Sequence, residues 1–365
     1  MNKILIIAPD FYPSKGGVES FLFNLNKYLN KIYDIKIFSG TRINSILSKK
    51  NYKVNNTLIY KYKTFKLFGI DFPTSIFTYY DLFKAIKKTD IVFINDVKMF
   101  FFSIVFFTKL LNKKTILVTH GLIFHNNRYM IFKKFFINIY VYILKNLITN
   151  VVANGVVDSK FLLKHRVNYN LINNGIYLEK FKCKRKNIKD RFVYFGRLSP
   201  NKGIENLISS LSFYKKKSPN FNLIIMGSGD TSYVELLKKK INSLDLSKNI
   251  KLFGKFTHKE LIKELSSSEF VFNPSSFESF GFTLIEALAA GCTVVANDIK
   301  QYQLILNEGN SFYLVDFSNY KSLLETINTA RLNYQNTNTE AINMSKNFSI
   351  DTMLQKYKKL FHEIS

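Results

Sequence analysis

Two glutamates eight residues apart flank a glycine in residues 277–291, FESFGFTLIEALAAG, and this run holds the most chemistry in the chain. Glu278 precedes Gly281, where the backbone can approach a ligand closely, and residues 282–290 are good helix formers followed by a glycine. The first turn of such a helix offers unpaired N–H groups and a positive dipole end to a diphosphate. Carboxylates accept hydrogen bonds from hydroxyls, so Glu278 and Glu286 suit a sugar and a ribose. The alternative is that both are ordinary surface charges beside an amphipathic helix.

The turn from Gly196 to Gly203, GRLSPNKG, follows the apolar run RFVYF and supplies two cations. Arg197 can donate a bidentate pair of hydrogen bonds to one anion, and Lys202 adds a point charge. Together with a helix N-terminus, they could stabilise the charge that develops on a leaving diphosphate. The alternative is a pair of solvated cations in a turn.

Three further features follow predicted strands, where open α/β sheets bind ligands. Gly16 and Gly17 come shortly after the first strand and open a helix, so the backbone there could approach a phosphate or a sugar. His120 ends the run TILVT, although a lone histidine is more often structural. Gly227 begins GSGD after another strand. Neither glycine turn completes G-x-G-x-x-G, so a dehydrogenase is not expected.

The sequence requires no metal. No two aspartates are separated by a single residue, so the D-x-D motif that holds a divalent ion on a sugar nucleotide is absent, as is a Walker A motif. Cys183 and Cys292 are far apart, which suggests neither a disulfide framework nor a cysteine metal cluster. A reducing cytoplasm is the simpler interpretation, and the short apolar N-terminus is expected to be a buried strand rather than a leader.

Positioning these residues requires elements that alternate between strand and helix along the whole chain. Strands are predicted at 4–8, 35–39, 57–62, 91–95, 115–119, 151–153, 171–173, 192–195, 222–226, 250–253, 270–273, 293–296 and 312–315. This alternation predicts an α/β fold with two doubly wound, Rossmann-like domains, each a parallel sheet covered on both faces. The cleft between the domains is the expected site.

Domain boundaries follow from the loss of hydrophobic periodicity. We expect an N-terminal domain over residues 1–173, a polar and basic linker over 174–190, and a C-terminal domain over 191–348. Residues 349–365 repeat apolar side chains at helical spacing, which predicts a helix that crosses back to the first domain.

The charge of the 365 residues is strongly positive, with 53 basic against 26 acidic residues and a net charge of +27. Residues 1–180 hold 27 Lys and Arg against 9 Asp and Glu, so this half carries +18 of the excess. Such an excess attracts polyanions, whether anionic lipid headgroups, phosphorylated acceptors or nucleic acid.

Two aromatic segments, 99–111 and 128–147, accompany the positive charge. The first is too short to cross a bilayer, and the second is interrupted by Lys133, Lys134 and Asn138. One interpretation is that both are helices packed on a sheet. The other is that they dock the N-terminal domain on an anionic membrane, with aromatic rings at the interface and lysines near the headgroups.

Taken together, the motifs resemble those of the retaining nucleotide-sugar glycosyltransferases of family 4, which have the GT-B fold. The ordered matches are GGVE at 16, HG at 120, NNGI at 173, GRLSPNKG at 196, GSGD at 227, and the pair Glu278 and Glu286. Each match is weak alone, and the ordered set is specific. Departures are Tyr177 where an acidic residue is commoner, Thr293 where Pro is usual, and the missing Gly-Gly in 297–302.

The resemblance implies roles for the matched residues. Glu278 would contact the hydroxyls of the donor sugar, Glu286 the ribose, and His120 the sugar near its 6-position. Arg197 and Lys202 would hold the diphosphate and act with Glu278 and His120 in catalysis. The phosphate and nucleotide site would be completed by Gly16, Gly17, Gly227, Gly281, Phe282 and Thr283.

The resemblance also implies a metal-independent hexosyltransferase without a cofactor, which takes a nucleoside diphosphate sugar and a lipid-linked or polysaccharide acceptor. It would work in cell-surface glycan synthesis, such as lipopolysaccharide or capsule, in the cytoplasm on the inner face of the membrane, and would not bind nucleic acid. One rival is a GT-B-type nucleotide-sugar epimerase. Such an enzyme needs acid and base groups beside the sugar, and Glu278 and His120 are few candidates for these roles. The other is a nucleic-acid-binding protein, suggested by charge and aromatic content and supported by no motif.

Overall fold

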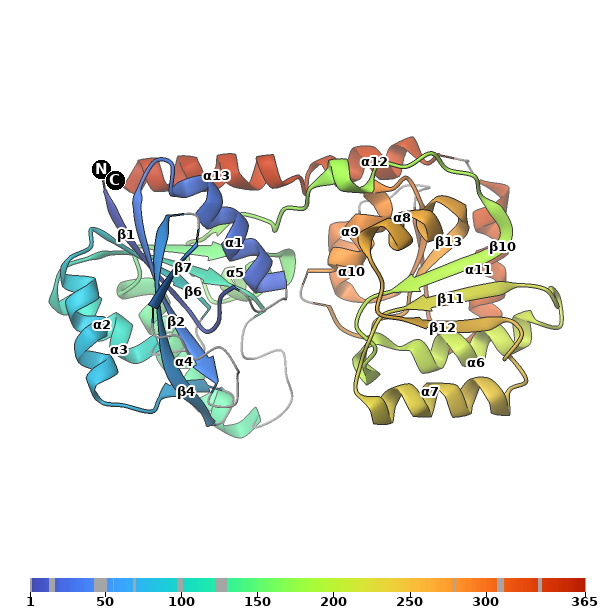
Figure 1. Cartoon of the computed structure of the whole chain (residues 1–365), viewed down its shortest axis with the longest axis horizontal. Helices are drawn as coiled ribbons and strands as arrows, with labels where there is room; N and C mark the ends of the chain where they lie inside the picture. The colour runs from blue at the N-terminus through green and yellow to red at the C-terminus, as the bar shows by residue number, and fades with distance from the viewer. Residues whose placement is uncertain are drawn as a thin grey trace. The chain divides into compact units, whose positions relative to one another are not determined.

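The computed structural model describes residues 2–12, 17–42, 51–54, 56–67, 70–96, 101–121, 130–278, 280–306, 312–333 and 337–364. The contacts divide the chain into two compact units (Figure 1). The N-terminal unit contains residues 1–175 and 351–365, and the C-terminal unit contains residues 176–350. The chain therefore passes between the units twice.

The N-terminal unit is built on a sheet with the order β3-β4-β2-β1-β6-β7-β8-β9, and β5 pairs with β4. Its strands are β1 Lys3–Ala8, β2 Asp34–Arg42, β3 Asn51–Val54, β4 Thr57–Leu67, β5 Ile70–Pro73, β6 Ile91–Asn95, β7 Lys114–Thr119, β8 Asn150–Ala153 and β9 Asn170–Leu171. The seven strands predicted for this half are present, although β9 lies one residue earlier and is shorter than the predicted strand 171–173. The strands β1, β2, β4 and β6 to β9 pair in parallel.

The prediction of a purely parallel sheet is wrong for this unit, because β3 and β5 run antiparallel to β4. Only residues 55 and 56 separate β3 from β4. A connection this short joins antiparallel strands, whereas a parallel crossover needs a dozen or more residues. The sequence analysis missed both strands because each has four residues, too few for an alternating pattern to stand out.

Helices cover both faces of this sheet. They are α1 Gly17–Leu29, α2 Phe77–Lys87, α3 Phe101–Leu110, α4 Met130–Asn146, α5 Val156–Lys164 and α13 Ile350–Ile364. Leu82 and Ile86 of α2 pack in one core cluster with the sheet residues Phe38 and Ile94. On the other face, the ring of Phe93 in β6 stacks on that of Phe361 in α13 at 5.8 Å. Figure 1 shows α13 running beside α1.

Helices α3 and α4 lie wholly within the two aromatic segments, 99–111 and 128–147. Helix α3 buries Phe101, Ile104 and Val105 against the sheet and exposes Phe102 and Phe106. One face therefore packs on the sheet, and the other remains open to an external partner. Of the helices in the described residues, none combines the length and the hydrophobicity that a bilayer crossing requires.

The C-terminal unit has a second doubly wound sheet, and here the parallel prediction is confirmed for every pair. The order is β12-β11-β10-β13-β14-β15, with β10 Ile188–Phe195, β11 Asn222–Met226, β12 Ile250–Gly254, β13 Ser268–Asn273, β14 Thr293–Asn297 and β15 Phe312–Val315. All six strands overlap the predicted ones. Their carboxyl ends share one edge of the sheet, which is where open α/β sheets place ligands.

The helical elements of this unit are η2 Leu178–Phe181, η3 Pro200–Lys202, α6 Ile204–Tyr214, α7 Thr231–Ser243, α8 His258–Ser267, α9 Phe282–Ala289, α10 Lys300–Ile305, α11 Tyr320–Leu332 and α12 Thr339–Lys346. Two core clusters lie on opposite faces of the sheet, one with Leu207 and Ile208 of α6 and one with Leu284 and Leu288 of α9. Strand β10 begins within the stretch 174–190 that was expected to be a linker.

Candidate functional site

Three loops of the C-terminal unit pack together beyond the carboxyl ends of β10, β11 and β13. Leu198, after β10, forms a bridge with Gly229, after β11. Gly203 lies against the loop after β13, because a Cβ atom on this residue would lie 2.0 Å from the carbonyl oxygen of Pro274. Its φ of +64° also belongs to the left-handed region that glycine adopts at no steric cost. Glycine at this position therefore allows the side chains of the two loops to meet.

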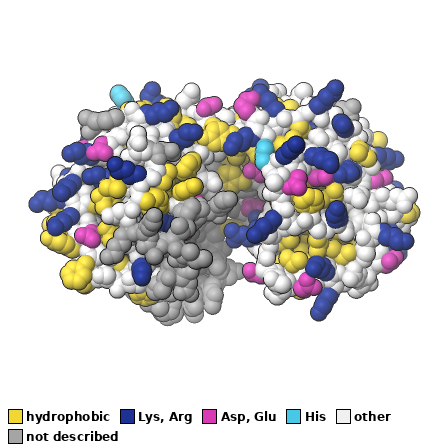
Figure 2. Space-filling model, in the orientation of Figure 1, with side chains coloured by type: hydrophobic (Ala, Val, Ile, Leu, Met, Phe, Trp, Pro, Cys, Tyr) yellow, Lys and Arg dark blue, Asp and Glu magenta, His cyan; other side chains and the backbone are white. Residues whose placement is uncertain are grey.

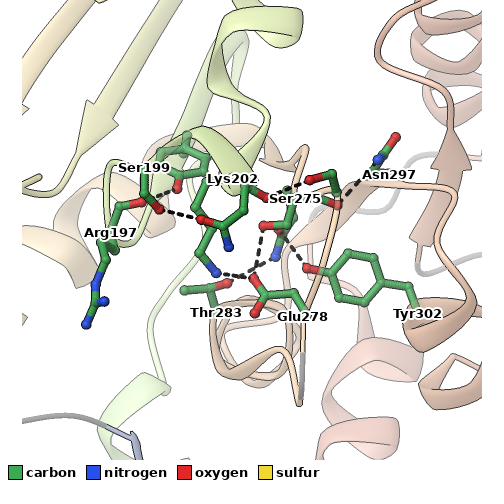
Figure 3. A network of polar contacts seen from close by, with 12 residues as sticks. Arg197, Ser199, Lys202, Ser275, Glu278, Thr283, Asn297 and Tyr302 are labelled. Atoms are coloured by element: carbon green, nitrogen blue, oxygen red, sulfur yellow. Dashed lines mark hydrogen bonds and ion pairs between the residues drawn. The ribbon is translucent and has the colours of Figure 1, made fainter. Parts of the chain in front are cut away.

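The predicted cation Lys202 and the predicted carboxylate Glu278 do meet at this junction. The Nζ atom of Lys202 lies 2.5 Å from Oε1 of Glu278, and both side chains are mostly buried (Figure 3). Ser275 donates a second hydrogen bond to the same oxygen at 2.9 Å. A charged hydrogen bond in a partly desolvated site is strong and fixes both side chains. The residues are 76 positions apart in the sequence.

A neutral network extends from this ion pair into the unit. Oδ1 of Asn273, the last residue of β13, accepts a hydrogen bond from the hydroxyl of Tyr302 at 2.8 Å. It also lies 3.0 Å from the hydroxyl oxygen of Ser275, whose single proton is shared between Asn273 and Glu278. Its Nδ2 group donates to Oγ1 of Thr283 at 3.0 Å. Figure 3 shows the Tyr302 hydroxyl pointing toward the Glu278 side of the network. The network holds the start of α9 in place relative to the loop of Glu278.

Helix α9 begins where the sequence predicts it, after Gly281. Gly281 is the N-cap residue, with φ +87°, and no side chain caps the helix. Among the described residues, the N–H groups of Phe282 and Thr283 have no acceptor, whereas those of Leu284 and Ile285 donate to the carbonyl of Gly281. The first turn thus offers two donors and a positive dipole end to an anion.

Glu286 and Arg197 lie in the same unit but do not join the ion pair. Within the described chain, neither the Glu286 carboxylate nor the Arg197 guanidinium has a hydrogen-bond or ion-pair partner. Desolvation raises the pKa of the Glu286 carboxyl from 4.5 to about 7. Arg197 is exposed, and Figure 3 shows its guanidinium extending away from Glu278. Arg197 is therefore open to a ligand, whereas Glu286 is a desolvated carboxylate without a partner in the described chain.

The structure places His120 in the N-terminal unit, at the carboxyl end of β7, where it joins a row of amides. Its Nε2 atom lies 2.7 Å from Oδ1 of Asn95, and its Nδ1 atom lies 2.8 Å from Nδ2 of Asn154. The same Asn154 amide donates to Oδ1 of Asn174 at 2.8 Å, and the ring of Phe21 packs edge-on against the imidazole at 5.0 Å. Asn95, Asn154 and Phe21 therefore contact the ring directly and fix its orientation, and Asn174 holds Asn154 in place.

The remaining predicted glycines have different surroundings. Gly16 lies outside the described residues, and Gly17 is the exposed first residue of α1. Gly227 is buried, and its N–H donates to the carbonyl oxygen of Gly254 at 2.9 Å. This N–H already has an acceptor within the protein, so it is not available to a ligand. Gly227 therefore contributes to the packing of the loops.

The described residues contain no cluster of three or more His, Cys, Asp or Glu side chains that could hold a metal ion. Cys183 and Cys292 are both free thiols. Burial raises the pKa of the Cys292 thiol to about 11, which keeps it protonated at neutral pH and unsuited to bind a metal.

Sequence reasoning missed the amides that organise both sites. Asn95 and Asn273 are the last residues of β6 and β13, and both are buried. A polar residue that ends a buried strand of a parallel sheet is a usable signal, since that end carries the ligands. Tyr302 lies on α10 and carries no such signal, because nothing in its local sequence indicates that its hydroxyl reaches Asn273.

Comparisons with known proteins agree with this arrangement. Residues 178–348 match the family described as "Glycosyl transferases group 1". The GDP-mannose:cellobiosyl-diphosphopolyprenol alpha-mannosyltransferase of Xanthomonas oryzae pv. oryzae is 21% identical over 338 residues, which cover 92% of this chain and 88% of that one. The crystal structure of Anabaena Alr3699/HepE in complex with UDP has a TM-score of 0.79 at 18% identity, over 99% of this chain and 100% of that one. A glycosyltransferase structure from Rickettsia africae has a TM-score of 0.75 at 21% identity, over 100% and 98%.

The family match and the mannosyltransferase relative identify a glycosyltransferase, and the solved structures share the fold of its two Rossmann-like units, the GT-B fold that the sequence predicts. The matched domain, residues 178–348, is of the group 1 type and contains Arg197, Lys202, Glu278 and Glu286. The predicted class, a nucleotide-sugar glycosyltransferase, is thereby confirmed, and the assignment to family 4 stays a prediction.

Proposed function

We propose that the protein transfers a sugar from a nucleoside diphosphate sugar to a lipid-linked or polysaccharide acceptor, with retention of the anomeric configuration. The observation that carries this proposal is the Lys202–Glu278 pair beside the uncapped first turn of α9, within the group 1 domain. The name of the Xanthomonas relative gives GDP-mannose as donor and a diphosphopolyprenol-linked acceptor, and HepE was crystallised with UDP. Both names support a nucleotide-sugar donor for this chain, for use in cell-surface glycan synthesis such as lipopolysaccharide or capsule.

The proposed reaction breaks the bond between the anomeric carbon of the sugar and the diphosphate, and an acceptor hydroxyl forms the new bond on the same face. Negative charge then develops on the departing diphosphate. The free guanidinium of Arg197, the ammonium of Lys202 and the N–H groups of Phe282 and Thr283 are the groups that would stabilise it. The diphosphate would in turn take the proton of the acceptor hydroxyl.

Two carboxylates and one imidazole would hold the sugars. Glu278 keeps one carboxylate oxygen, Oε2, outside the bonds that Lys202 and Ser275 make to Oε1, so it can accept from a donor hydroxyl. Glu286 would accept from the ribose hydroxyls, a contact that repays the cost of burying its charge. His120 would contact the sugar near its 6-position from the N-terminal unit.

We further propose that transfer needs no metal ion or other cofactor. In this proposal the two cations and the helix N-terminus carry the electrostatic role that a divalent ion has in D-x-D enzymes. Turnover would then be unchanged by a chelator such as EDTA, and a loss of activity restored by Mg²⁺ or Mn²⁺ would refute metal independence.

We also propose that the protein works in the cytoplasm, peripherally on the inner face of the membrane. The +18 charge of residues 1–180 and the exposed faces of the aromatic helices support an anionic surface as partner. Nucleic acid is not expected as a partner, because no motif for it accompanies the charge.

The test of the activity is transfer from a panel of nucleoside diphosphate sugars to a diphosphate-linked lipid acceptor, for the wild type and for Glu278→Gln. We expect product with one donor and a fall of at least about 100-fold in kcat/KM for the variant, since loss of a charged hydrogen bond in the site costs on the order of 2–4 kcal/mol. The matched control is Glu235→Gln, which breaks an exposed Lys238–Glu235 pair of 2.8 Å in the same unit and should leave turnover unchanged.

Incubation of the donor without acceptor separates the transferase from the epimerase. An epimerase converts the sugar nucleotide without acceptor, so accumulation of a new nucleotide sugar under these conditions would refute the proposal. Unchanged turnover in Glu278→Gln, with the fold intact by thermal unfolding, would refute the site.

A further inference from the structure

A groove of about 810 Å³ lies in the N-terminal unit between α2 and the sheet, and neither site described above includes it. Its floor is the face of β2 and β4 that carries Lys36, Phe38, Tyr60 and Tyr62, and α2 forms its wall. We call it the α2 groove. Alternate residues of neighbouring parallel strands share a face, which brings these four side chains together.

The charge of the α2 groove is unbalanced. Lys3, Lys36, Lys84 and Lys88 line it against two aspartates, Asp34 and Asp81. Within the described residues, none of these four lysines forms an ion pair with an acid. Lys61 and Lys63 also line the groove but are left out of the count, because they alternate with Tyr60 and Tyr62 along β4 and so face away from the floor; the Lys61 ammonium is 3.0 Å from Asp10. Unpaired like charges gathered around one hollow favour an anionic occupant.

The floor of the groove is aromatic and partly desolvated. The rings of Phe38 and Tyr62 stack with centroids 4.2 Å apart, and Phe38 is fully buried. Desolvation and the nearby Asp81 raise the pKa of the Tyr62 hydroxyl above its ordinary value. The groove thus combines an apolar base with a cationic wall, which suits an anion attached to an apolar body.

The rim of the groove continues into an exposed apolar surface. At the start of α2, Ile76 is 79% and Phe77 74% exposed, and Tyr80 follows one turn later. On the neighbouring α3, Phe102 and Phe106 also face outward. Figure 2 shows hydrophobic side chains among Lys and Arg on the side of this unit where α2 and α3 are drawn. Aromatic side chains beside lysines are typical of surfaces that lie at the boundary of a bilayer.

One end of the groove lies at the edge of the sheet opposite to His120. Lys3 and Asp34 are the first residues of β1 and β2, and Lys88 precedes β6, so this end of the groove lies at the amino ends of the strands. His120 and Asn95 lie at carboxyl ends. An occupant at that end would therefore be separate from a donor or acceptor bound beside His120.

We propose that the α2 groove binds the phosphate headgroup of an anionic membrane lipid. The lysines contact the phosphate, and the rim formed by Ile76, Phe77 and Tyr80 enters the interfacial region of the bilayer. This inference rests on the membrane contact proposed above and assigns it to one site. It does not depend on which sugar the enzyme transfers.

The test compares vesicle binding of a groove variant with that of a charge-matched control. The groove variant is Lys36→Ala, Lys84→Ala and Lys88→Ala. The control is Lys27→Ala, Lys356→Ala and Lys358→Ala, which removes three exposed lysines of α1 and α13 in the same unit, the helices that cover the other face of the sheet. Partition is measured by sedimentation with phosphatidylcholine vesicles that contain or lack phosphatidylglycerol.

We expect the groove variant to lose at least about tenfold in partition to phosphatidylglycerol vesicles, because each lysine near an anionic surface contributes on the order of 1 kcal/mol. The control variant should lose less than about twofold in the same assay. Equal losses in the two variants would show that total charge, not the groove, directs binding, and would overturn the proposal. An unchanged groove variant would overturn it as well.

Two further arms identify the ligand and separate this inference from the catalytic one. Acetylation of Lys36 and Lys84 is followed by mass spectrometry. Anionic vesicles should protect both lysines, whereas free inorganic phosphate should not. Equal protection by free phosphate would assign the groove to a soluble anion and overturn the lipid source. Transfer to a water-soluble acceptor should stay unchanged in the groove variant, so a loss of vesicle binding alone leaves the proposed activity intact.

Discussion

The carboxyl edges of the two sheets carry different chemistry. In the C-terminal unit the edge is charged, with Lys202 paired to Glu278 and the guanidinium of Arg197 left free among the described residues. In the N-terminal unit the neutral amides Asn95 and Asn154 hydrogen-bond to His120 at this edge, and the charged side chains beside them, Asp96 and Asp158, are buried acids rather than cations. Charged groups hold a diphosphate, whereas amides and an imidazole exchange hydrogen bonds with hydroxyls.

The comparison indicates how the work is divided between two units of similar topology. The C-terminal unit has the groups needed to bind the diphosphate of the donor, which carries the negative charge and is the leaving group. The N-terminal unit has groups that can recognise a neutral sugar without attracting a second phosphate to the same edge. Lysines of this unit line the α2 groove instead, and two of them, Lys3 and Lys88, lie at the other end of the strands.

The largest effect that tests this division is expected for Lys202→Met. The substitution keeps the length of the side chain, removes the cation, and leaves Glu278 mostly buried beside Ser275 without its partner. We expect kcat/KM to fall by about 100-fold or more and the affinity for the free nucleoside diphosphate to fall with it, because an unpaired buried charge costs on the order of 3–5 kcal/mol. Isothermal titration calorimetry and initial rates measure the two quantities.

The matched control is Lys238→Met, whose ammonium pairs with Glu235 at 2.8 Å on the exposed face of α7. An exposed pair contributes about 0–1 kcal/mol, so both quantities should stay within about twofold of the wild type. If Lys202→Met binds the nucleotide as tightly as the wild type, the charged edge does not bind the diphosphate. The proposed difference between the two units would then be wrong.

The sequence alone predicts most of the C-terminal unit and less of the N-terminal one. All six strands of the second sheet were expected, because each is a short apolar run bounded by turn residues and paired in parallel. In the first sheet, β3 and β5 were missed, since antiparallel strands of four residues leave no periodic signal. The prediction of the fold class does not depend on β3 and β5, because the longer parallel strands form the core.

The charged residues of the candidate site were predictable, and their contacts were not. Glu278 and Lys202 were singled out from their turns, but the 76 residues between them carry no information on the 2.5 Å contact. That contact depends on the close approach of Gly203 to Pro274. Tyr302 and Asn273 were missed, since a buried hydrogen bond between distant residues is fixed by packing, which no local pattern reports.

The next effect tests whether loop packing creates the charged edge. Gly203→Ala places a Cβ 2.0 Å from the Pro274 oxygen at a φ of +64°, so the two loops must separate. We expect a loss of about 2–4 kcal/mol in unfolding free energy together with weaker nucleotide binding, because steric overlap adds to the cost of a left-handed alanine. Chemical denaturation and calorimetry measure both.

Gly254→Ala is the control for backbone conformation. Gly254 has a φ of +84°, and no atom lies within 4 Å of the position its Cβ would take. The variant should therefore lose only about 1 kcal/mol, the conformational part of the cost. Equal losses in the two variants would show that the approach of Gly203 to Pro274 does not matter to the site.

The smallest expected effect concerns Glu286, the acid of the charged edge that has no cation in the described residues. Burial raises the pKa of its carboxyl to about 7 in the folded protein, above its ordinary value of 4.5. Between these values the folded state binds more protons than the unfolded state, so the contribution of Glu286 to stability falls as the pH rises from about 4.5 through 7. Glu286→Gln removes this titration and should become more stable relative to the wild type at pH 8 than at pH 5, by about 2 kcal/mol. Urea unfolding of both proteins at pH 5 and pH 8 measures the change. If the difference in unfolding free energy between variant and wild type stays constant within about 0.5 kcal/mol, the Glu286 carboxylate must find a partner when it ionises. The charged edge would then be fully paired.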